Sequence, residues 1–440
     1  MYPDPTTALP LPPRPDLEHY RKRAKELVKA CTSGDPDAIR LWAKQWLAAL
    51  AGRSQDTAQR REIGARADEM ATFARARLSP SGTSSASCRL ADAQFVIARA
   101  HGFPSWPVLV THLESLARSG SPVSAFEAAA DAIVAGEEAT LERLLREHAA
   151  LIRARSTREH RATLLHYVSA NGVEGYRQKT PANTVRVARI LLEAGAEVDA
   201  QAEVYGGGCT TLGLAATSAH PHGAGVQREL LNLLLAHGAR MDLPGLAGNR
   251  HSLVRACFAN GQPDAAEYLA GRGAPLDLPA AAGVGRLDVV QTFFDEGGRL
   301  RGGASRPQML EGFSLACAFG RADVADFLLD RGIDVNAELS HHGRGHTGLH
   351  TAAYRGHVDV VRLLLERSAR VAVLDREWGT TPLVWALTGW SDRPGTDPSR
   401  YRSIVALLVA AGAKVTPDLL EWEKARADPG MLAALRGERP

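Results

Sequence analysis

Apolar residues recur at helical spacing from residue 16 onward. Asp16 is suited to an N-cap, and a second helix is predicted with Asp35 as its N-cap and Pro36 at its first position. The apolar stripe of this second helix follows the i, i+3, i+4, i+7 spacing: Ile39, Trp42, Ala43, Trp46, Leu47 and Leu50. Three further segments are predicted helices: about 54–78, 90–102 and 105–116. The pattern therefore predicts a small helical domain over residues 16–118.

The segments outside this domain have a different composition. Residues 1–15 are rich in proline, which predicts an extended, poorly ordered leader, with a ligand for a proline-binding domain as an alternative. The sequence SGSP predicts a linker over 119–122. Residues 421–440 are predicted to form a C-terminal capping helix or tail.

Beyond residue 122 one sequence phrase recurs, a leucine-rich helix followed by Gly-Ala or a variant. Its clearest copies are ARILLEAGAEVDA (188–200), LNLLLAHGARMD (231–242), ADFLLDRGIDVNA (325–337), VRLLLERSARVAV (361–373) and VALLVAAGAKVT (405–416). With two weaker copies, AEYLAGRGAPLD (266–277) and VQTFFDEGGRL (290–300), three of the six intervals between successive copies are 35 or 36 residues. A fixed period of this length indicates stacked structural repeats, each of which buries its apolar face against its neighbours.

The segment HTGLHTAAYRGHVDVVRLLLERSA (346–369) resembles the ankyrin-repeat consensus of a TPLH-like start, a small-residue helix, a glycine turn and a leucine-rich helix. Three other segments resemble it: GTTPLVWALTGW (379–390), TTLGLAATSA (210–219) and GFSLACAFGRADVADFLLDRGIDVN (312–336). The resemblance implies about eight repeats over residues 123–420. The predicted fold is thus all-α: a small N-terminal helical domain followed by an ankyrin-repeat solenoid with short β-hairpin fingers.

The N-terminal domain has a resemblance of its own. LEHYRKRAKELVKA (17–30) and LADAQFVIARAHGFPSWPVLVTHLESL (90–116) resemble the leader domain of a group of bacterial ankyrin-repeat proteins. This resemblance implies the architecture and no particular activity.

Composition and charge narrow the function classes. The net charge is only +3 over 440 residues, which gives no electrostatic case for broad binding to nucleic acid or an anionic membrane. No run reaches the roughly 18 apolar residues of a membrane span, and the N-terminus lacks the pattern of a secretory signal. The five cysteines are widely spaced without a CxxC pair, which argues against a disulfide framework or a zinc knuckle. We expect a soluble, monomeric protein of the reducing cytoplasm.

Insertions between the repeats are the candidate binding regions, because insertions in solenoids gather on loops. They occupy residues 173–184, 202–209, 218–225, 338–346 and 390–400. Aromatic and arginine side chains near the presumed concave face are the expected partner contacts: Tyr205, Arg344, Tyr354, Arg355, Trp378 and Trp390. Trp378 can alternatively pack against an adjacent finger, and Trp385 is predicted to lie in the core.

Histidines are dense between residues 338 and 357. His350 and His357 occupy positions where the resemblance implies structural hydrogen bonds, which leaves His341, His342 and His346 as candidate metal ligands. A metal-dependent protein or an enzyme using these histidines is the alternative function.

No catalytic or cofactor motif appears in the sequence: no GxSxG, HExxH or phosphate-binding loop. Cys257 and Cys317 are predicted to be packed core residues, and no cofactor is expected. The basic cluster RKRAK over 21–25 suggests nucleic-acid binding as a second alternative, although a solvated helix face also explains it. The leading prediction is a scaffold that binds another protein through its concave face and lengthened fingers.

Overall fold

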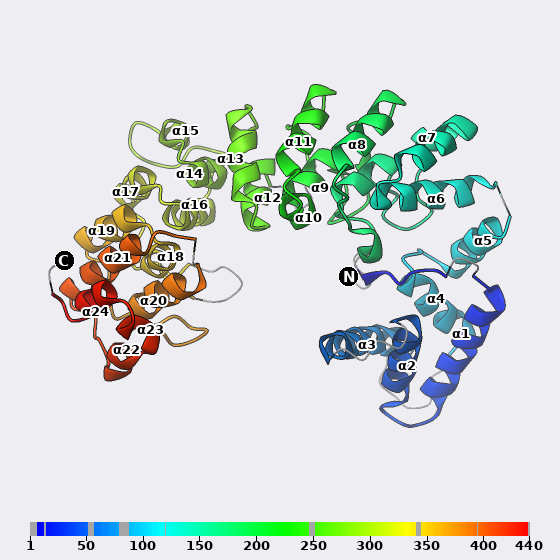
Figure 1. Ribbon diagram of the computed structural model, residues 1–440, viewed down its shortest axis with the longest axis horizontal. Helices are drawn as coiled ribbons and strands as arrows, with labels where there is room; N and C mark the ends of the chain where they lie inside the picture. Colours follow the sequence, from blue (N-terminus) through cyan, green and yellow to red (C-terminus); the bar gives the residue numbers. More distant parts are fainter. Residues whose placement is uncertain are drawn as a thin grey trace. The chain divides into compact units, whose positions relative to one another are not determined.

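The computed structural model of the chain describes residues 7–12, 15–51, 57–78, 88–118, 120–245, 251–339, 345–393 and 395–438. The secondary structure of these residues is mostly helical, as predicted (Figure 1). The chain divides into two compact units, Met1–Ala265 and Ala266–Pro440. This division falls inside the predicted repeat array and not at the predicted linker over 119–122.

Among the described residues, five helices open the first unit, in agreement with the five segments predicted from the pattern. They are α1 (Leu17–Thr32), α2 (Ala38–Ala51), α3 (Thr57–Leu78), α4 (Leu90–Ala100) and α5 (Trp106–Leu116). The side chain of Asp16 caps α1 by accepting a hydrogen bond from the N–H of Glu18 over 3.0 Å. α2 begins two residues later than predicted, because Asp35 and Pro36 lie in the preceding loop and turn. The apolar stripes of the helices meet in one core that includes Leu27, Trp46, Met70, Ile97 and Leu109.

Residues 7–12 pack against this bundle. Leu9 is 3% exposed and belongs to the core of the bundle. Its N–H donates to the carbonyl of Ala100 over 2.8 Å, and its own carbonyl accepts a hydrogen bond from Nδ1 of His101 over 3.0 Å. The prediction of a poorly ordered leader is wrong for this stretch, because its apolar residues find a complementary surface on α4. Apart from Pro15, the rest of the leader lies outside the described residues.

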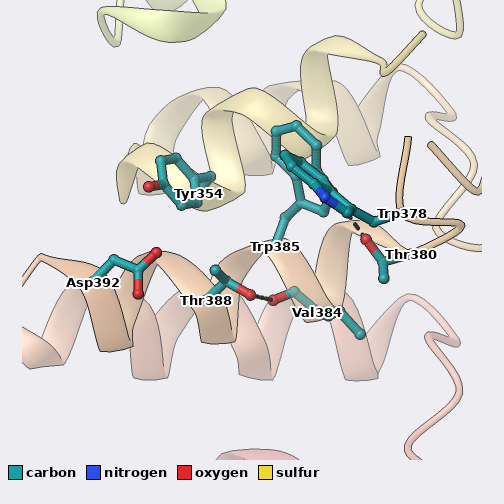
Figure 2. Close-up of a pocket in the computed structure, with 7 residues that line it drawn as sticks. All are labelled: Tyr354, Trp378, Thr380, Val384, Trp385, Thr388 and Asp392. Atoms are coloured by element: carbon teal, nitrogen blue, oxygen red, sulfur yellow. Dashed lines mark hydrogen bonds between the residues drawn. The ribbon is translucent and has the colours of Figure 1, made fainter. Parts of the chain in front are cut away.

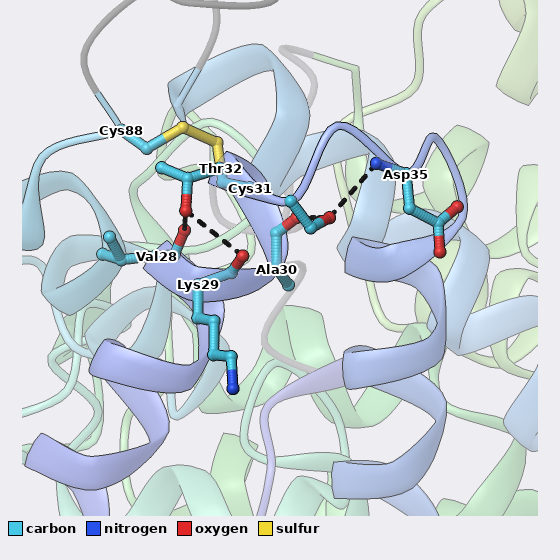
Figure 3. Close-up of a disulfide and its surroundings, with 8 residues drawn as sticks. Val28, Lys29, Ala30, Cys31, Thr32, Asp35 and Cys88 are labelled. Atoms are coloured by element: carbon cyan, nitrogen blue, oxygen red, sulfur yellow. Dashed lines mark hydrogen bonds between the residues drawn. A yellow bond between two sulfur atoms is a disulfide. The ribbon is translucent and has the colours of Figure 1, made fainter.

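Cys31 and Cys88 form a disulfide, which the sequence argued against (Figure 3). Cys31 lies in the last turn of α1 and Cys88 just before α4, and these two helices pack together. The two Cα atoms are 6.2 Å apart although 57 residues separate the cysteines in sequence. The packing of α1 against α4 brings the two cysteines together, so their spacing in the sequence does not indicate the disulfide. Cys209, Cys257 and Cys317 are free and buried, as predicted for the last two.

The rest of the first unit consists of short helix pairs. Its helices are α6 (Pro122–Ala135), α7 (Glu138–Glu147), η2 (Ala149–Arg153), η3 (Leu164–Ser169), η4 (Gly175–Arg177), α8 (Thr184–Glu193), α9 (Thr211–Thr217), α10 (Ala219–Gly223), α11 (Gln227–Ala236) and α12 (Leu253–Ala259). The strands β1 (Gln201–Ala202) and β2 (Cys209–Thr210) pair antiparallel, so the predicted finger over 202–209 is a hairpin. α13 (Pro263–Gly271) crosses the division between the units.

The second unit continues with helix pairs. Its helices are α14 (Leu278–Val284), α15 (Leu287–Thr292), α16 (Arg306–Ala318), α17 (Ala322–Asp330), α18 (Gly348–Arg355), α19 (Val358–Glu366), α20 (Pro382–Asp392), α21 (Pro398–Ala410), α22 (Pro417–Glu421), α23 (Glu423–Arg426) and α24 (Pro429–Leu435). A bridge between Leu339 and His346 joins the two ends of the predicted finger over 338–346. Within 421–440, α24 buries Met431 and Leu435 in the core that runs through this unit. Within the described residues, no helix combines the length and apolar character that crossing a bilayer requires.

Small residues bring the first helices of successive pairs close together. A Cβ added at Gly348 of α18 would lie 2.9 Å from Sγ of Cys317 in α16. A Cβ added at Gly389 of α20 would lie only 2.1 Å from the carbonyl oxygen of Tyr354 in α18. At Gly389 the backbones of α18 and α20 are therefore in direct contact, and a side chain at this position would force the two helices apart.

Two histidines repeat the same structural role in the two units. Nδ1 of His166 accepts a hydrogen bond from the N–H of Thr163 over 3.1 Å, and its Nε2 donates to the carbonyl of Cys209 over 3.3 Å. His350 accepts from the N–H of Thr347 over 3.2 Å and donates to a carbonyl of the next finger in the same way. The hydrogen-bonding role predicted for His350 is thus confirmed.

Candidate functional site

A groove lies between α18 and α20 in the second unit (Figure 2). Its volume of about 420 Å³ is in the range of ligand-binding pockets. Seven of the residues that the structure describes line it, and we call it the aromatic groove: Tyr354, Trp378, Thr380, Val384, Trp385, Thr388 and Asp392.

Asp375 holds the loop that carries Trp378, which we call the 375–380 finger. Its carboxylate accepts hydrogen bonds from the N–H of Trp378 (2.7 Å) and the N–H of Thr380 (2.9 Å). The Thr380 hydroxyl (2.6 Å) and Nε1 of Trp385 (3.2 Å) donate to the same carboxylate. Burial raises the pKa of Asp375, but these hydrogen bonds outweigh burial and hold the pKa well below its usual range. A buried, ionised carboxylate therefore fixes the finger to α20.

The Trp385 ring is surrounded by other rings. Its centroid lies 5.7 Å from that of Trp378 and 6.0 Å from that of Tyr354, with the tyrosine ring nearly perpendicular to the indole. His346 and His350 contact it at 5.2 Å and 5.3 Å. These separations are those of favourable aromatic pairs, so the cluster is held by ring contacts as well as by Asp375.

One face of α20 forms the floor of the aromatic groove. Val384, Thr388 and Asp392 follow each other at four-residue spacing, and Figure 2 shows them in a row beneath Tyr354 of α18. The Thr388 hydroxyl donates to the carbonyl of Val384 over 2.9 Å, so it is already engaged. Asp392 is exposed and supplies the one carboxylate among the seven lining residues, none of which carries a positive charge.

Two of the predicted partner-binding residues meet at this groove. Trp378 is 56% exposed and Tyr354 is half-buried, and both line the cavity. The prediction for Trp390 is wrong, since this residue is 8% exposed and belongs to the core. Its ring packs edge-on against Trp422 at 5.6 Å, and the Lys424 ammonium covers it at 4.9 Å.

Trp385 is the site residue that the sequence prediction missed. It was expected to lie in the core, but it is half-buried and forms one wall of the aromatic groove. A signal was present, because Thr388 and Asp392 follow Trp385 at i+3 and i+7 and therefore share its side of α20. Polar residues on the same helix face indicate that this face is not fully buried.

The other predicted contacts lie apart from the groove. The Arg355 guanidinium covers the ring of Phe319 at 5.5 Å, and burial lowers the pKa of Arg355. Tyr205 belongs to the first unit, where its hydroxyl donates to Asn171 over 2.9 Å. Arg344 lies outside the described residues.

The predicted metal ligands are only partly placed. His341 and His342 lie outside the described residues, and His346 is buried against Trp385. Among the residues that the structure describes, no group of three or more His, Cys, Asp or Glu side chains is arranged to hold a metal ion. The histidine site stays a prediction.

The insertion over 173–184, expected to be a binding loop, contributes to a buried ion network. Glu174 and Glu127 both pair with the Arg158 guanidinium, at 2.9 Å and 2.6 Å. Arg177 pairs with Glu127 at 2.8 Å. Burial raises the pKa of Glu127, but Arg158 and Arg177 outweigh burial and hold the pKa at about 2. Arg158 also covers the ring of Phe103 at 5.3 Å, so this network joins the N-terminal bundle to the helix pairs that follow it.

The basic cluster on α1 is partly neutralised within the helix. Arg21 pairs with Glu18, and Arg23 pairs with Glu26 at 3.1 Å. Pairs of this kind are typical of a solvated helix face.

Comparison with known families identifies part of the chain. Residues 313–418 match the family Ankyrin repeats (3 copies). The matched stretch includes α18, α20 and the 375–380 finger, so the aromatic groove lies within it. Ankyrin repeats generally mediate protein–protein interaction.

A similarity to one curated protein is short. Over 55 residues the chain is 44% identical to the serine/threonine-protein kinase TNNI3K of Mus musculus. The alignment covers 12% of this chain and 6% of that kinase.

Proposed function

We propose that the protein binds another protein through the aromatic groove and the fingers beside it. The observation that carries this proposal is the position of Trp378, which is more than half exposed at the edge of a groove with two further aromatic walls. Tryptophan and tyrosine are the residues that most often anchor a protein interface. Asp375 fixes the finger before any partner arrives, so binding loses little conformational freedom.

In this proposal the repeats form a solenoid of about eight units over residues 123–420, with the groove on its partner-binding face. Two features support the array beyond the matched region. The leucine-rich phrase recurs from residue 188 onward. His166 of the first unit also repeats the hydrogen bonds of His350.

The test is affinity capture from the cells that make the protein, with the full chain as bait in three forms. These are the unaltered chain, Trp378→Ala, and Leu374→Ala. Leu374 is a matched control, because it is 58% exposed on the same inter-helix segment and does not line the groove. We expect one protein to be retained in stoichiometric amount by the unaltered chain and by Leu374→Ala, and to be lost from Trp378→Ala.

A partner retained equally by all three baits would place the interface away from the groove and refute the proposal. Tyr354→Ala is a second variant for the same comparison, because its ring forms the opposite wall. Both variants should keep the helical circular dichroism of the unaltered chain, which separates a lost contact from a lost fold.

A further inference from the structure

The aromatic groove has the chemistry of a site for a cation without hydrogen-bond donors. Three aromatic residues line it, and two of them present rings 5.7 Å and 6.0 Å from the third, Trp385. The faces of such rings carry negative partial charge and attract cations, with tryptophan the strongest of the natural side chains.

Charges around the rings favour a positive ligand. Among the described residues that line the groove, Asp392 is the only charged one. Asp375 lies at the edge of the indole and accepts the hydrogen bond of Trp385 Nε1 over 3.2 Å. A carboxylate bound to the indole N–H increases the electron density of the ring, which strengthens its attraction for a cation on its face.

The described lining residues offer a cation few hydrogen-bond acceptors: one carboxylate, Asp392, and two threonine hydroxyl oxygens. The Thr380 hydroxyl is engaged with Asp375, and the Thr388 hydroxyl with Val384. A lysine ammonium carries three N–H donors and an arginine guanidinium five, and both lose water when they enter an aromatic site. A trimethylammonium group has no donor to satisfy, so entry into this groove costs it less.

We propose that the aromatic groove recognises a trimethylated lysine side chain of the partner protein. This inference rests on the proposed function, because it assigns the chemistry of the partner group that the groove receives. The trimethylammonium lies against Trp378, Trp385 and Tyr354, and the four-carbon stem lies along the face of α20 that carries Thr388. A cavity of about 420 Å³ has space for the stem as well as the head group.

The experiment uses the full chain and three small probes, followed by calorimetry or tryptophan fluorescence. The first probe is Nα-acetyl-trimethyl-lysine methylamide, and the second is its unmethylated counterpart. The third replaces the trimethylammonium with a tert-butyl group, which keeps the shape and removes the charge. We expect the trimethylated probe to bind about tenfold more tightly than either of the others.

Variants locate the binding. Trp378→Ala is expected to weaken binding of the trimethylated probe about tenfold, and Trp378→Phe to weaken it less, because a ring face remains. Leu374→Ala should leave binding unchanged. Equal affinity for the trimethylammonium and tert-butyl probes would show a merely apolar groove and overturn the inference. Unchanged binding by Trp378→Ala, or no binding of any probe, would also overturn it.

The source of the cation is tested with choline, which carries the same head group without the lysine stem. Choline binding as tightly as the lysine probe would assign the groove to a free small molecule and overturn the lysine identity. A captured partner that requires Trp378 but is not displaced by excess trimethyl-lysine probe would refute the inference and leave the proposed function standing. A partner indifferent to Trp378 refutes the proposed function itself.

Discussion

Asp375 and Trp385 are joined by a hydrogen bond of 3.2 Å from the indole Nε1 to a carboxylate oxygen. The same carboxylate accepts the N–H groups of Trp378 and Thr380, so one buried side chain sets the position of two tryptophans. The aromatic groove is therefore a preformed feature of the fold.

Replacing Asp375 tests this arrangement. In Asp375→Asn the side-chain amide cannot accept from all the donors that face it, so we expect the free energy of unfolding to fall by about 2 kcal/mol. Hydrogen exchange at the N–H groups of Trp378 and Thr380 should become faster, which mass spectrometry of the exchanged peptides measures. Asp392→Asn is the matched control, because Asp392 is exposed and its loss should change the stability by less than about 0.5 kcal/mol. Unchanged exchange in Asp375→Asn would contradict the role given to this carboxylate.

The buried ion network provides a second prediction. In Arg158→Met the carboxylates of Glu127 and Glu174 would stay buried with one cation fewer, so we expect a loss of about 3 kcal/mol in unfolding free energy. Arg143→Met removes an exposed pair with Glu147 at 2.7 Å and should cost less than about 0.5 kcal/mol. Urea unfolding of the two variants makes the comparison. Equal losses would mean that the network adds nothing beyond an ordinary surface pair.

The fold should lose stability in mildly acidic solution. Burial lowers the pKa of His101 and of His166 to about 4, below the value of about 6.5 expected in an unfolded chain. Protonation of these two histidines therefore favours unfolding. The unfolding free energy has its full value above about pH 6.5, where both histidines are neutral in either state, and it falls as the pH drops from 6.5 toward 4. Between pH 7 and pH 5 each of these histidines is expected to lower the unfolding free energy by about 2 kcal/mol.

Denaturant unfolding at several pH values checks this expectation. The carboxylates with lowered pKa, such as Glu127, lose their contribution only below about pH 4.5, so they do not affect this window. In His101→Phe the unfolding free energy should fall less steeply with decreasing pH, and the difference in slope should correspond to about one bound proton. In His220→Gln, at an exposed position, the unfolding free energy should fall as it does in the unaltered chain. A decline of equal slope in His101→Phe would show that this residue is not the one being protonated.

The disulfide predicts a thiol count. Alkylation of the denatured, unreduced chain should label three cysteines, and reduction should raise the number to five. Because the bond closes a loop of 57 residues, the chain-entropy model predicts that reduction lowers the unfolding free energy by about 4 kcal/mol. The double variant Cys31→Ser, Cys88→Ser should be insensitive to reductant. Five labels before reduction would contradict the pairing.

Local patterns predicted most of the helices. The cap at Asp16 and the stripe through Trp42 and Trp46 depend on residues within a few positions of each other, and both were identified. The segment 346–369, which resembles an ankyrin repeat, lies inside the region 313–418 that matches the family.

Features that depend on tertiary contact were missed. Nothing near Cys31 indicates Cys88, and nothing near Leu9 indicates the surface on α4 that buries it. The candidate site shows the same limit at Trp390, whose burial depends on which face of α20 meets its neighbours. Trp385 differs, because the polar residues on its helix face did indicate partial exposure. Residues a few positions apart on one helix can have opposite environments, and only the packing of that helix decides between them.

Gly389 has a consequence for how this site can change over evolutionary time. Because a Cβ at this position would lie 2.1 Å from the carbonyl oxygen of Tyr354, the approach of α18 and α20 at this point is set by two backbones and not by side chains. Substitutions along the groove can therefore alter the ligand while the approach of α18 and α20 at Gly389 stays the same. A lineage that keeps this glycine can acquire a new specificity by exchanging a few side chains, without rebuilding the scaffold that presents them.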